Sequence, residues 1–123
     1  MPSPIYTHEW HGLDVKAEDG EKIGAVEDVY VDDVTGEGEF ILVRGGIFGS
    51  RKSLVPLTGV VRVNDGALRV PYPKPMVRAA PGVEADAELT AEEESQLYAH
   101  YGMDYVAAAG GTLRPGHDYA GMR

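Results

Sequence analysis

The sequence predicts a mainly β fold, a small closed barrel, with one helix near the C-terminal end. Its apolar residues stand in short runs of strand length, and turn-forming residues separate these runs. The 123 residues include 16 glycines and 8 prolines, a composition that favours many turns over a helical bundle. A chain of this length suits one domain with one core, so we expect no separate catalytic domain.

The N-terminal part predicts a lead-in segment followed by the first hairpin. Residues 1–11 form the lead-in, and residues 12–78 are assigned to the barrel. A short strand at 13–17 is followed by a polar cluster in which Gly20 can adopt a positive φ. We therefore expect a turn at this point.

Residues 23–31 predict a second strand whose pattern contains a conflict. Alternate positions are apolar, as in a half-buried strand, but Glu27 falls among them while Val26 and Tyr30 fall on the other side. A bulge or burial on both faces would explain this pattern. The run Phe-Ile-Leu-Val at 40–43 is apolar throughout and predicts the most buried strand.

The clearest turn signal lies in the middle of the chain. Residues 60–63 and 67–70 flank Asn-Asp-Gly, whose residue types tolerate the left-handed backbone of a tight hairpin turn. Pro56 suits the end of the preceding strand. Regular pairing should stop at three later prolines, which lack a backbone donor: Pro71, Pro73 and Pro75.

The helix signal is a capping box. Thr90 can cap a helix and Glu93 can reciprocate. Leu97, Tyr98 and Tyr101 share one face of this helix, so we expect the stripe to dock on the barrel or on a partner.

The C-terminal region divides into an extension and a tail. Residues 79–105 form the extension that carries the helix, and residues 106–123 predict a flexible tail. No apolar stretch approaches the roughly 20 residues that span a bilayer, and the N-terminus has no signal-peptide pattern. We therefore expect a cytoplasmic protein without membrane insertion. The lack of cysteine excludes thiol chemistry and fits a reducing compartment.

The charge is strongly acidic but unevenly distributed. A net charge of -9 disfavours generic binding to nucleic acid or anionic membranes. Between residues 44 and 78, however, only Asp65 is acidic, and the segment contains these cations: Arg44, Arg51, Lys52, Arg62, Arg69, Lys74 and Arg78. A locally basic surface could meet the acidic flank of a second copy.

The glycine-rich segment 45–49 offers a candidate interaction loop. An exposed Phe48 beside Arg51 and Lys52 would form an apolar anchor with a charged rim, as in interaction hot spots. The alternative is that Phe48 packs into the barrel mouth. A phosphate loop is disfavoured, because the Walker pattern requires glycine immediately before lysine, where Arg51 stands.

Signals for metals and catalysis are weak. His8 and His11 have no carboxylate at a diagnostic spacing, and the acids between 32 and 39 lack the EF-hand pattern. A small barrel also fills its interior with side chains and leaves little cavity for an active site. We expect no cofactor, no metal and no enzymatic activity.

The order of motifs resembles the PRC-barrel family, which is named for the cytoplasmic domain of the photosynthetic reaction-centre H subunit and includes ribosome-maturation factors. The matching segments are 20–32, 35–36, 42–44, 46–49, 54–57 and 68–72. Residues 80–81, 89–90, 92–93 and 97–102 resemble the extension of a bacterial, particularly actinobacterial, subgroup whose members often carry a further stress-associated C-terminal domain. The resemblance implies a barrel of about five or six strands that serves as an adaptor, often a homodimer, without shared catalytic residues.

The leading hypothesis is therefore a non-catalytic adaptor or scaffolding module that binds proteins and forms a homodimer. The candidate partner-binding residues are Phe48, Arg51, Lys52, Leu97, Tyr98 and Tyr101. One alternative is a ribosome- or RNA-associated module that uses the basic segment from Arg44 to Arg78. Another is a binder of a small molecule or metal.

Overall fold

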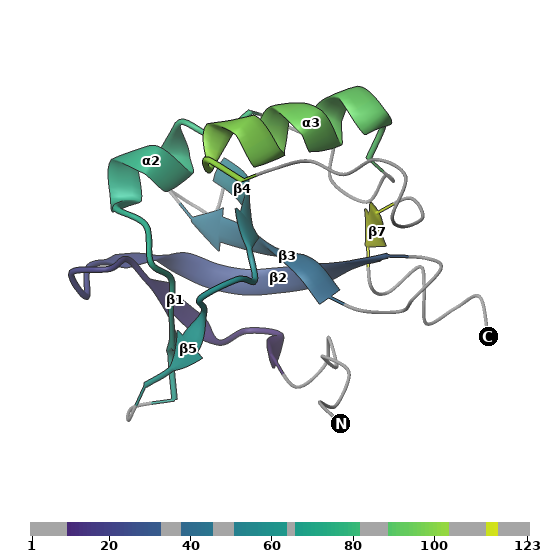
Figure 1. Ribbon diagram of the computed structural model, residues 1–123. Coiled ribbons are helices and arrows are strands. Elements are labelled where there is room, and N and C mark those ends of the chain that lie inside the picture. Colours follow the sequence, from purple (N-terminus) through teal and green to yellow (C-terminus); the bar gives the residue numbers. More distant parts are fainter. Residues whose placement is uncertain are drawn as a thin grey trace.

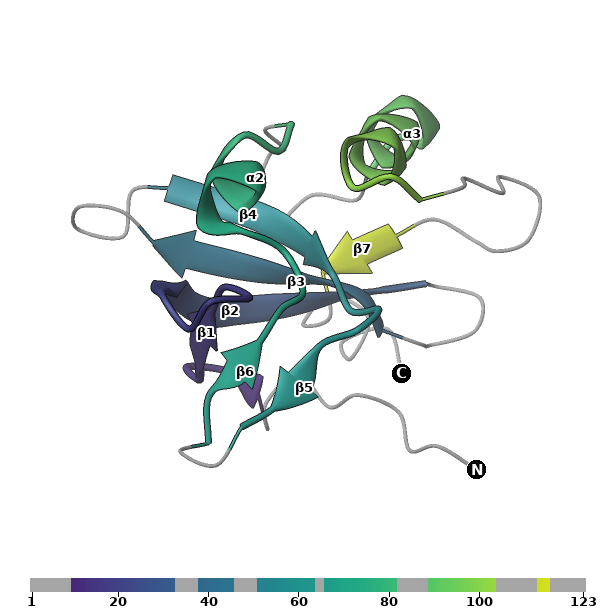
Figure 2. The ribbon, with the colours of Figure 1, turned by 60° about the vertical axis from the view of Figure 1, so that its left-hand side comes forward.

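In the part of the chain that the structure describes, one curved sheet carries two helices on the same side of β3 and β4 (Figures 1 and 2). The computed structural model describes residues 10–32, 38–45, 51–63, 66–81, 89–103 and 113–115. The strands are β1 (Asp14–Lys16), β2 (Lys22–Asp32), β3 (Gly38–Gly45), β4 (Arg51–Pro56), β5 (Val61–Arg62), β6 (Leu68–Arg69) and β7 (Leu113–Pro115). The helices are α2 (Lys74–Arg78) and α3 (Ala91–His100).

The sheet has the strand order β4-β3-β2-β1-β6-β5, and β7 pairs with β2. Its two end strands, β4 and β5, are consecutive in the chain and are joined by residues 57–60, so the sheet curls round to meet itself. Among the described residues, no strand ladder joins β4 to β5, whereas α2 contacts β4. The predicted small barrel is confirmed, but the chain connection and a helix complete its wall where a ladder would close it.

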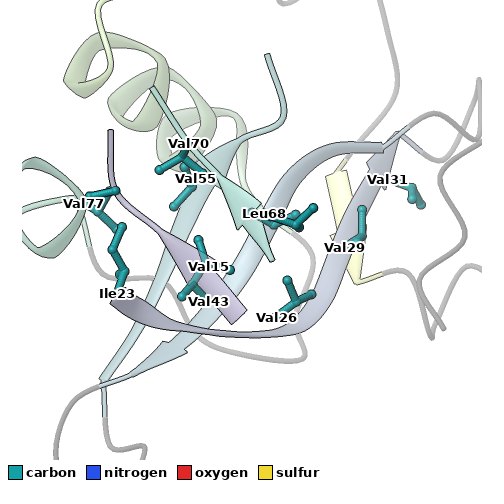
Figure 3. Packing of buried hydrophobic residues seen from close by; sticks show 12 residues of the cluster. Val15, Ile23, Val26, Val29, Val31, Val43, Val55, Leu68, Val70 and Val77 are labelled. Carbon is teal, nitrogen blue, oxygen red and sulfur yellow. The ribbon is translucent and has the colours of Figure 1, made fainter. Parts of the chain in front are cut away.

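The interior of the barrel is a cluster of buried aliphatic side chains, called here the inner cluster (Figure 3). It comprises Val15, Ala17, Ile23, Val26, Val29, Val31, Ile41, Val43, Val55, Leu68, Val70 and Val77. Five strands contribute to this cluster, namely β1, β2, β3, β4 and β6, and Val77 comes from α2. The helix thus fills the barrel interior as well as covering its open side.

A bulge in β2 resolves the conflict in the strand pattern. Val26 pairs with Val43, but the next pair joins Asp28 to Leu42, so Glu27 is an extra residue in β2. This insertion lets Val26 and Val29 both face the barrel interior. Burial on both faces also occurs, since Tyr30 lies on the opposite side and is fully buried.

The outer face of β2, β3 and β4 carries a second buried cluster, called here the outer cluster. It comprises Tyr30, Phe40, Leu42, Leu54, Leu89, Leu97, Tyr101 and Leu113. β3 alternates between the clusters: Ile41 and Val43 point inward, while Phe40 and Leu42 point to the outer cluster. All four are at most 1% exposed, which confirms the predicted buried strand.

The predicted turns are confirmed. The β1–β2 hairpin turns through Gly20 at φ 92°, and the antiparallel β5–β6 hairpin turns through Gly66 at φ 89°. β4 ends at Pro56. The next residue, Leu57, donates its N–H to the Glu39 carbonyl at 3.0 Å. Backbone hydrogen bonds to one neighbouring strand fall on alternate residues, so Pro56 lies at a position where no N–H donor is needed.

Two elements differ from the prediction. The sequence predicts only one helix, but α2 begins directly after Pro73 and has Pro75 in its first turn. The prolines that end strand pairing also suit a helix start, because their fixed φ is helical and the first turn needs no backbone donor. The prediction of a flexible tail over 106–123 is wrong for 113–115, because β7 pairs with β2 and Leu113 is buried.

Candidate functional site

The helix stripe of the sequence-based hypothesis is packed inside the chain. Leu97 is fully buried and Tyr101 is 5% exposed. Tyr98 is half-buried and makes an edge-to-face contact with Phe40, with ring centroids 5.7 Å apart. Of the two alternatives, docking on the barrel is therefore the one observed. This corrects the assignment of Leu97 and Tyr101 to partner binding, because neither presents a surface to another molecule.

Tyr101 binds the edge of the sheet. Its hydroxyl donates a hydrogen bond to the Leu54 carbonyl at 2.7 Å, and its ring lies 4.8 Å from that of Tyr72. Burial raises the pKa of the Tyr101 hydroxyl, and the neighbouring Tyr72 raises that pKa further. Burial also raises the pKa of Tyr72. Both hydroxyls therefore stay neutral, and that of Tyr101 serves as a donor to an edge strand.

Three further contacts attach the C-terminal extension to α2 and β7. His100 Nε2 lies 2.7 Å from the Met76 carbonyl, and this nitrogen must carry a proton because a carbonyl only accepts. The buried Glu94 accepts the Leu113 N–H at Oε2 over 3.3 Å. Leu89 donates its N–H to the Leu113 carbonyl at 2.8 Å. These polar groups have structural partners, so we assign them to holding the layers together.

The second group of predicted site residues lies around the end of the β3–β4 hairpin. Phe48 lies outside the described residues. Arg51 begins β4, but its side chain is also outside the described part of the chain. Lys52 is described, and its Nζ lies 2.9 Å from Oε2 of Glu27.

Glu27 binds two cations from neighbouring strands. Its Oε1 lies 3.1 Å from Nε of Arg44, while its Oε2 contacts Lys52, and Arg44 and Lys52 are paired across β3 and β4. We call these three residues the Glu27 fork. The side chain of Glu27 is 20% exposed, against 54% for Arg44 and 35% for Lys52. One sheltered carboxylate therefore positions two accessible cations.

Two glycines bring β2 and β3 close together beside the fork. Gly24 pairs with Gly45. A Cβ at Gly24 would overlap the Arg44 carbonyl oxygen, and one at Gly45 would overlap that of Ile23. Only glycine fits this approach of two backbones. The strands β2 and β3 are consequently packed closely together where β3 leads into the β3–β4 connection.

Sequence reasoning found Lys52 but missed Glu27 and Arg44 as its neighbours. The irregular position of Glu27 in the strand pattern was the available signal, because it predicted the bulge. The partners of the carboxylate depend on the register of three strands, which a single sequence does not provide.

The basic segment does not form an uninterrupted positive surface in the described part of the chain. Arg44 and Lys52 share Glu27, and Nζ of Lys74 lies 3.3 Å from Oε2 of Glu21. Ion pairing lowers the local positive potential that nucleic-acid binding requires. No observation on the described residues favours the RNA hypothesis.

Other site types find little support among the residues that the structure describes. An open depression of 510 Å³ is lined by Glu21, Lys74, Pro75, Arg78 and Ala79. Within the described ranges, no three His, Asp or Glu side chains gather as metal ligands would. The helices in these ranges are too short or too polar to cross a membrane.

Comparison with known proteins identifies a family for most of the barrel. A family model described as the PRC-barrel domain matches residues 4–77, more than half of the chain. The match includes part of the predicted lead-in, and Trp10 from this part packs against the inner cluster. It leaves out α3 and β7. A search of curated proteins finds no match.

Proposed function

The chain belongs to the PRC-barrel family, and on this premise we propose that it is a non-catalytic adaptor or scaffolding module that acts through protein–protein contacts. The observation that carries the proposal is the filled barrel interior, in which the inward side chains of five strands are buried. A substrate needs a concave site lined by convergent polar groups, and an aliphatic interior provides none. Function on this fold would then reside on its outer surface.

The end of the β3–β4 hairpin is the contact surface that we propose. The helix stripe is already used within the chain, whereas the Glu27 fork presents accessible cations on closely packed strands. The segment that joins β3 to β4 also contains Phe48, the apolar anchor of the sequence-based hypothesis. A rigid stem lowers the entropy lost when such a surface binds its partner.

Site-specific photo-crosslinking in the native cell tests this proposal. A photoreactive residue is placed at Arg51 beside the fork, and the matched control carries it at the exposed Arg69 on β6. We expect an adduct with a protein other than a second copy of this chain from position 51 and no such adduct from position 69. Equal labelling at both positions, or no protein adduct from position 51, would contradict the hairpin as the contact surface.

Exposure on the end strand β5 favours a homodimer as a second candidate. Val61 is 47% exposed, and β5 ends the hydrogen-bonded sheet. An edge strand offers unpaired backbone groups that a second copy can bind. Light scattering over a range of concentrations should detect a dimer that Val61→Lys disrupts. A monomer at every concentration would remove this candidate and leave the adaptor proposal intact.

A further inference from the structure

The Glu27 fork concentrates positive charge on an acidic chain. Two cations, Arg44 and Lys52, share one carboxylate, which leaves one net positive charge at the fork. The whole chain carries a net charge of -9. A fixed local charge of the opposite sign is a feature that selects partners by charge complementarity.

The hydrogen-bonding groups of Arg44 are only partly used. Arg44 contacts Glu27 through Nε, one of the three nitrogen atoms of its guanidinium group, and its side chain is 54% exposed. A guanidinium group offers donors in a planar arrangement that matches a carboxylate with two parallel hydrogen bonds. Lys52 Nζ carries donors beyond the one that contacts Glu27. The fork therefore has donors for a second carboxylate beside the one it already holds.

The bulge in β2 accounts for the position of Glu27. The extra residue turns its carboxylate toward Arg44 on β3 and Lys52 on β4. Bulges often re-aim a side chain next to a functional site, while ion pairs at exposed positions contribute little to stability. Stability alone is thus a poor explanation for a bulge that holds two accessible cations in one orientation.

We propose that the Glu27 fork docks a carboxylate side chain from an acidic segment of a partner protein, an inference that rests on the proposed adaptor function. Glu27 keeps Arg44 and Lys52 oriented before binding, so little side-chain freedom is lost when the partner carboxylate arrives. A nucleic acid fits this site less well, because its regular row of phosphates needs a row of free cations. Here the carboxylate of Glu27 lies between two cations, and Lys74 is held by Glu21.

Titration of the full chain with tetraglutamate, followed by amide chemical shifts, tests the proposal. We expect shifts in residues 25–28, 42–45 and 52–54. Arg44→Gln should weaken binding about fivefold, the effect of losing one exposed charge-assisted contact. Arg44→Lys keeps the charge but removes the planar donors, so it should weaken binding about twofold. Arg69→Gln, which removes an exposed cation on β6, is the matched control and should bind like the natural chain.

Three results of this titration would overturn the inference. The first is an equal loss of affinity in Arg44→Gln and Arg69→Gln, and the second is shifts confined to other regions. The third is tighter binding of a thymidine oligonucleotide than of tetraglutamate at the same salt concentration. Lys52→Gln repeats the test at the second cation if Arg44→Gln fails to fold. If a partner is crosslinked from position 51 and the substitutions at Arg44 and Lys52 do not change the yield of this adduct, acidic docking is refuted while the adaptor function is preserved.

Discussion

The inner and outer clusters share β2, β3 and β4 but are built from different chemistry. The inner cluster is wholly aliphatic, and the residues that form it lie within or at the end of the family-matched segment 4–77. The outer cluster contains Tyr30, Phe40 and Tyr101, and half of its buried residues come from the part of the chain after that segment. Side chains that alternate along β2, β3 and β4 thus contribute to two cores. The barrel itself covers the inner one, and a later part of the chain covers the outer one.

The polar contacts of the two regions differ in the same way. No polar side chain belongs to the inner cluster among the described residues. At the outer layer, the Tyr101 hydroxyl binds the Leu54 carbonyl and Glu94 binds the Leu113 N–H. Apolar burial is non-directional, whereas hydrogen bonds fix the position of an added layer. These hydrogen bonds therefore fix the position of the extension relative to the barrel.

Matched leucine deletions test whether the two clusters form one cooperative unit. Leu68→Ala opens the inner cluster and Leu97→Ala opens the outer one, and both leucines are fully buried. Each substitution should lower the free energy of unfolding by about 2–5 kcal/mol because it leaves a cavity. Urea unfolding followed by both circular dichroism and tyrosine fluorescence measures this. An unchanged midpoint for Leu97→Ala would show that the extension contributes nothing to global stability.

A change in the shared strands should disturb both clusters. Gly24→Ala places a Cβ against the Arg44 carbonyl oxygen, so β2 and β3 must separate at this point. We expect a loss of about 1–3 kcal/mol, as in other overpacked sites. Chemical denaturation measures the loss, and Gly20→Ala provides a contrast, since a Cβ there meets open space and only its positive φ opposes the change. Equal stability of Gly24→Ala and the natural chain would refute the close approach.

The Tyr101 hydroxyl gives the outer layer a sensitivity to alkaline pH. Tyr101→Phe should cost about 0.5–1.5 kcal/mol at neutral pH through the lost bond to Leu54. In the unfolded chain Tyr101 ionises near pH 10.0, whereas burial raises its pKa in the folded chain. Stability is thus fully present below pH 10.0 and falls as the pH rises above it, because only the unfolded chain releases the proton.

Denaturation at a series of pH values between neutral and strongly alkaline checks this dependence. The natural chain should lose stability more steeply than Tyr101→Phe. Parallel curves for the two proteins would mean that Tyr101 does not keep its proton in the folded state.

The smallest effect on stability is expected at the surface. Lys52→Gln breaks one exposed contact of the Glu27 fork and should change the free energy of unfolding by only about 0.2–1 kcal/mol. The same denaturation assay measures it. A loss as large as that of Leu97→Ala would make the fork a structural element and remove the reason to treat it as a docking surface.

Local patterns predicted a large part of this molecule. The capping box formed as expected, with Glu93 N–H donating to Thr90 Oγ1 at 3.1 Å and Thr90 N–H donating to Glu93 Oε1 at 2.8 Å. The turn glycines and the buried run in β3 were also correct. These features depend on residues within one or two turns of each other, so composition and order are enough to specify them.

The sequence by itself determined the strands from β1 to β6, the turns at Gly20 and Gly66, and the start of α3. Only the tertiary structure decided that the Leu97 stripe faces the barrel, that Leu113 forms a seventh strand beside β2, and that Glu27 joins Arg44 to Lys52. Each of these outcomes depends on which distant segments become neighbours. Strand register and the packing of layers determine which segments become neighbours, and the local sequence around a residue does not specify its neighbour on another strand.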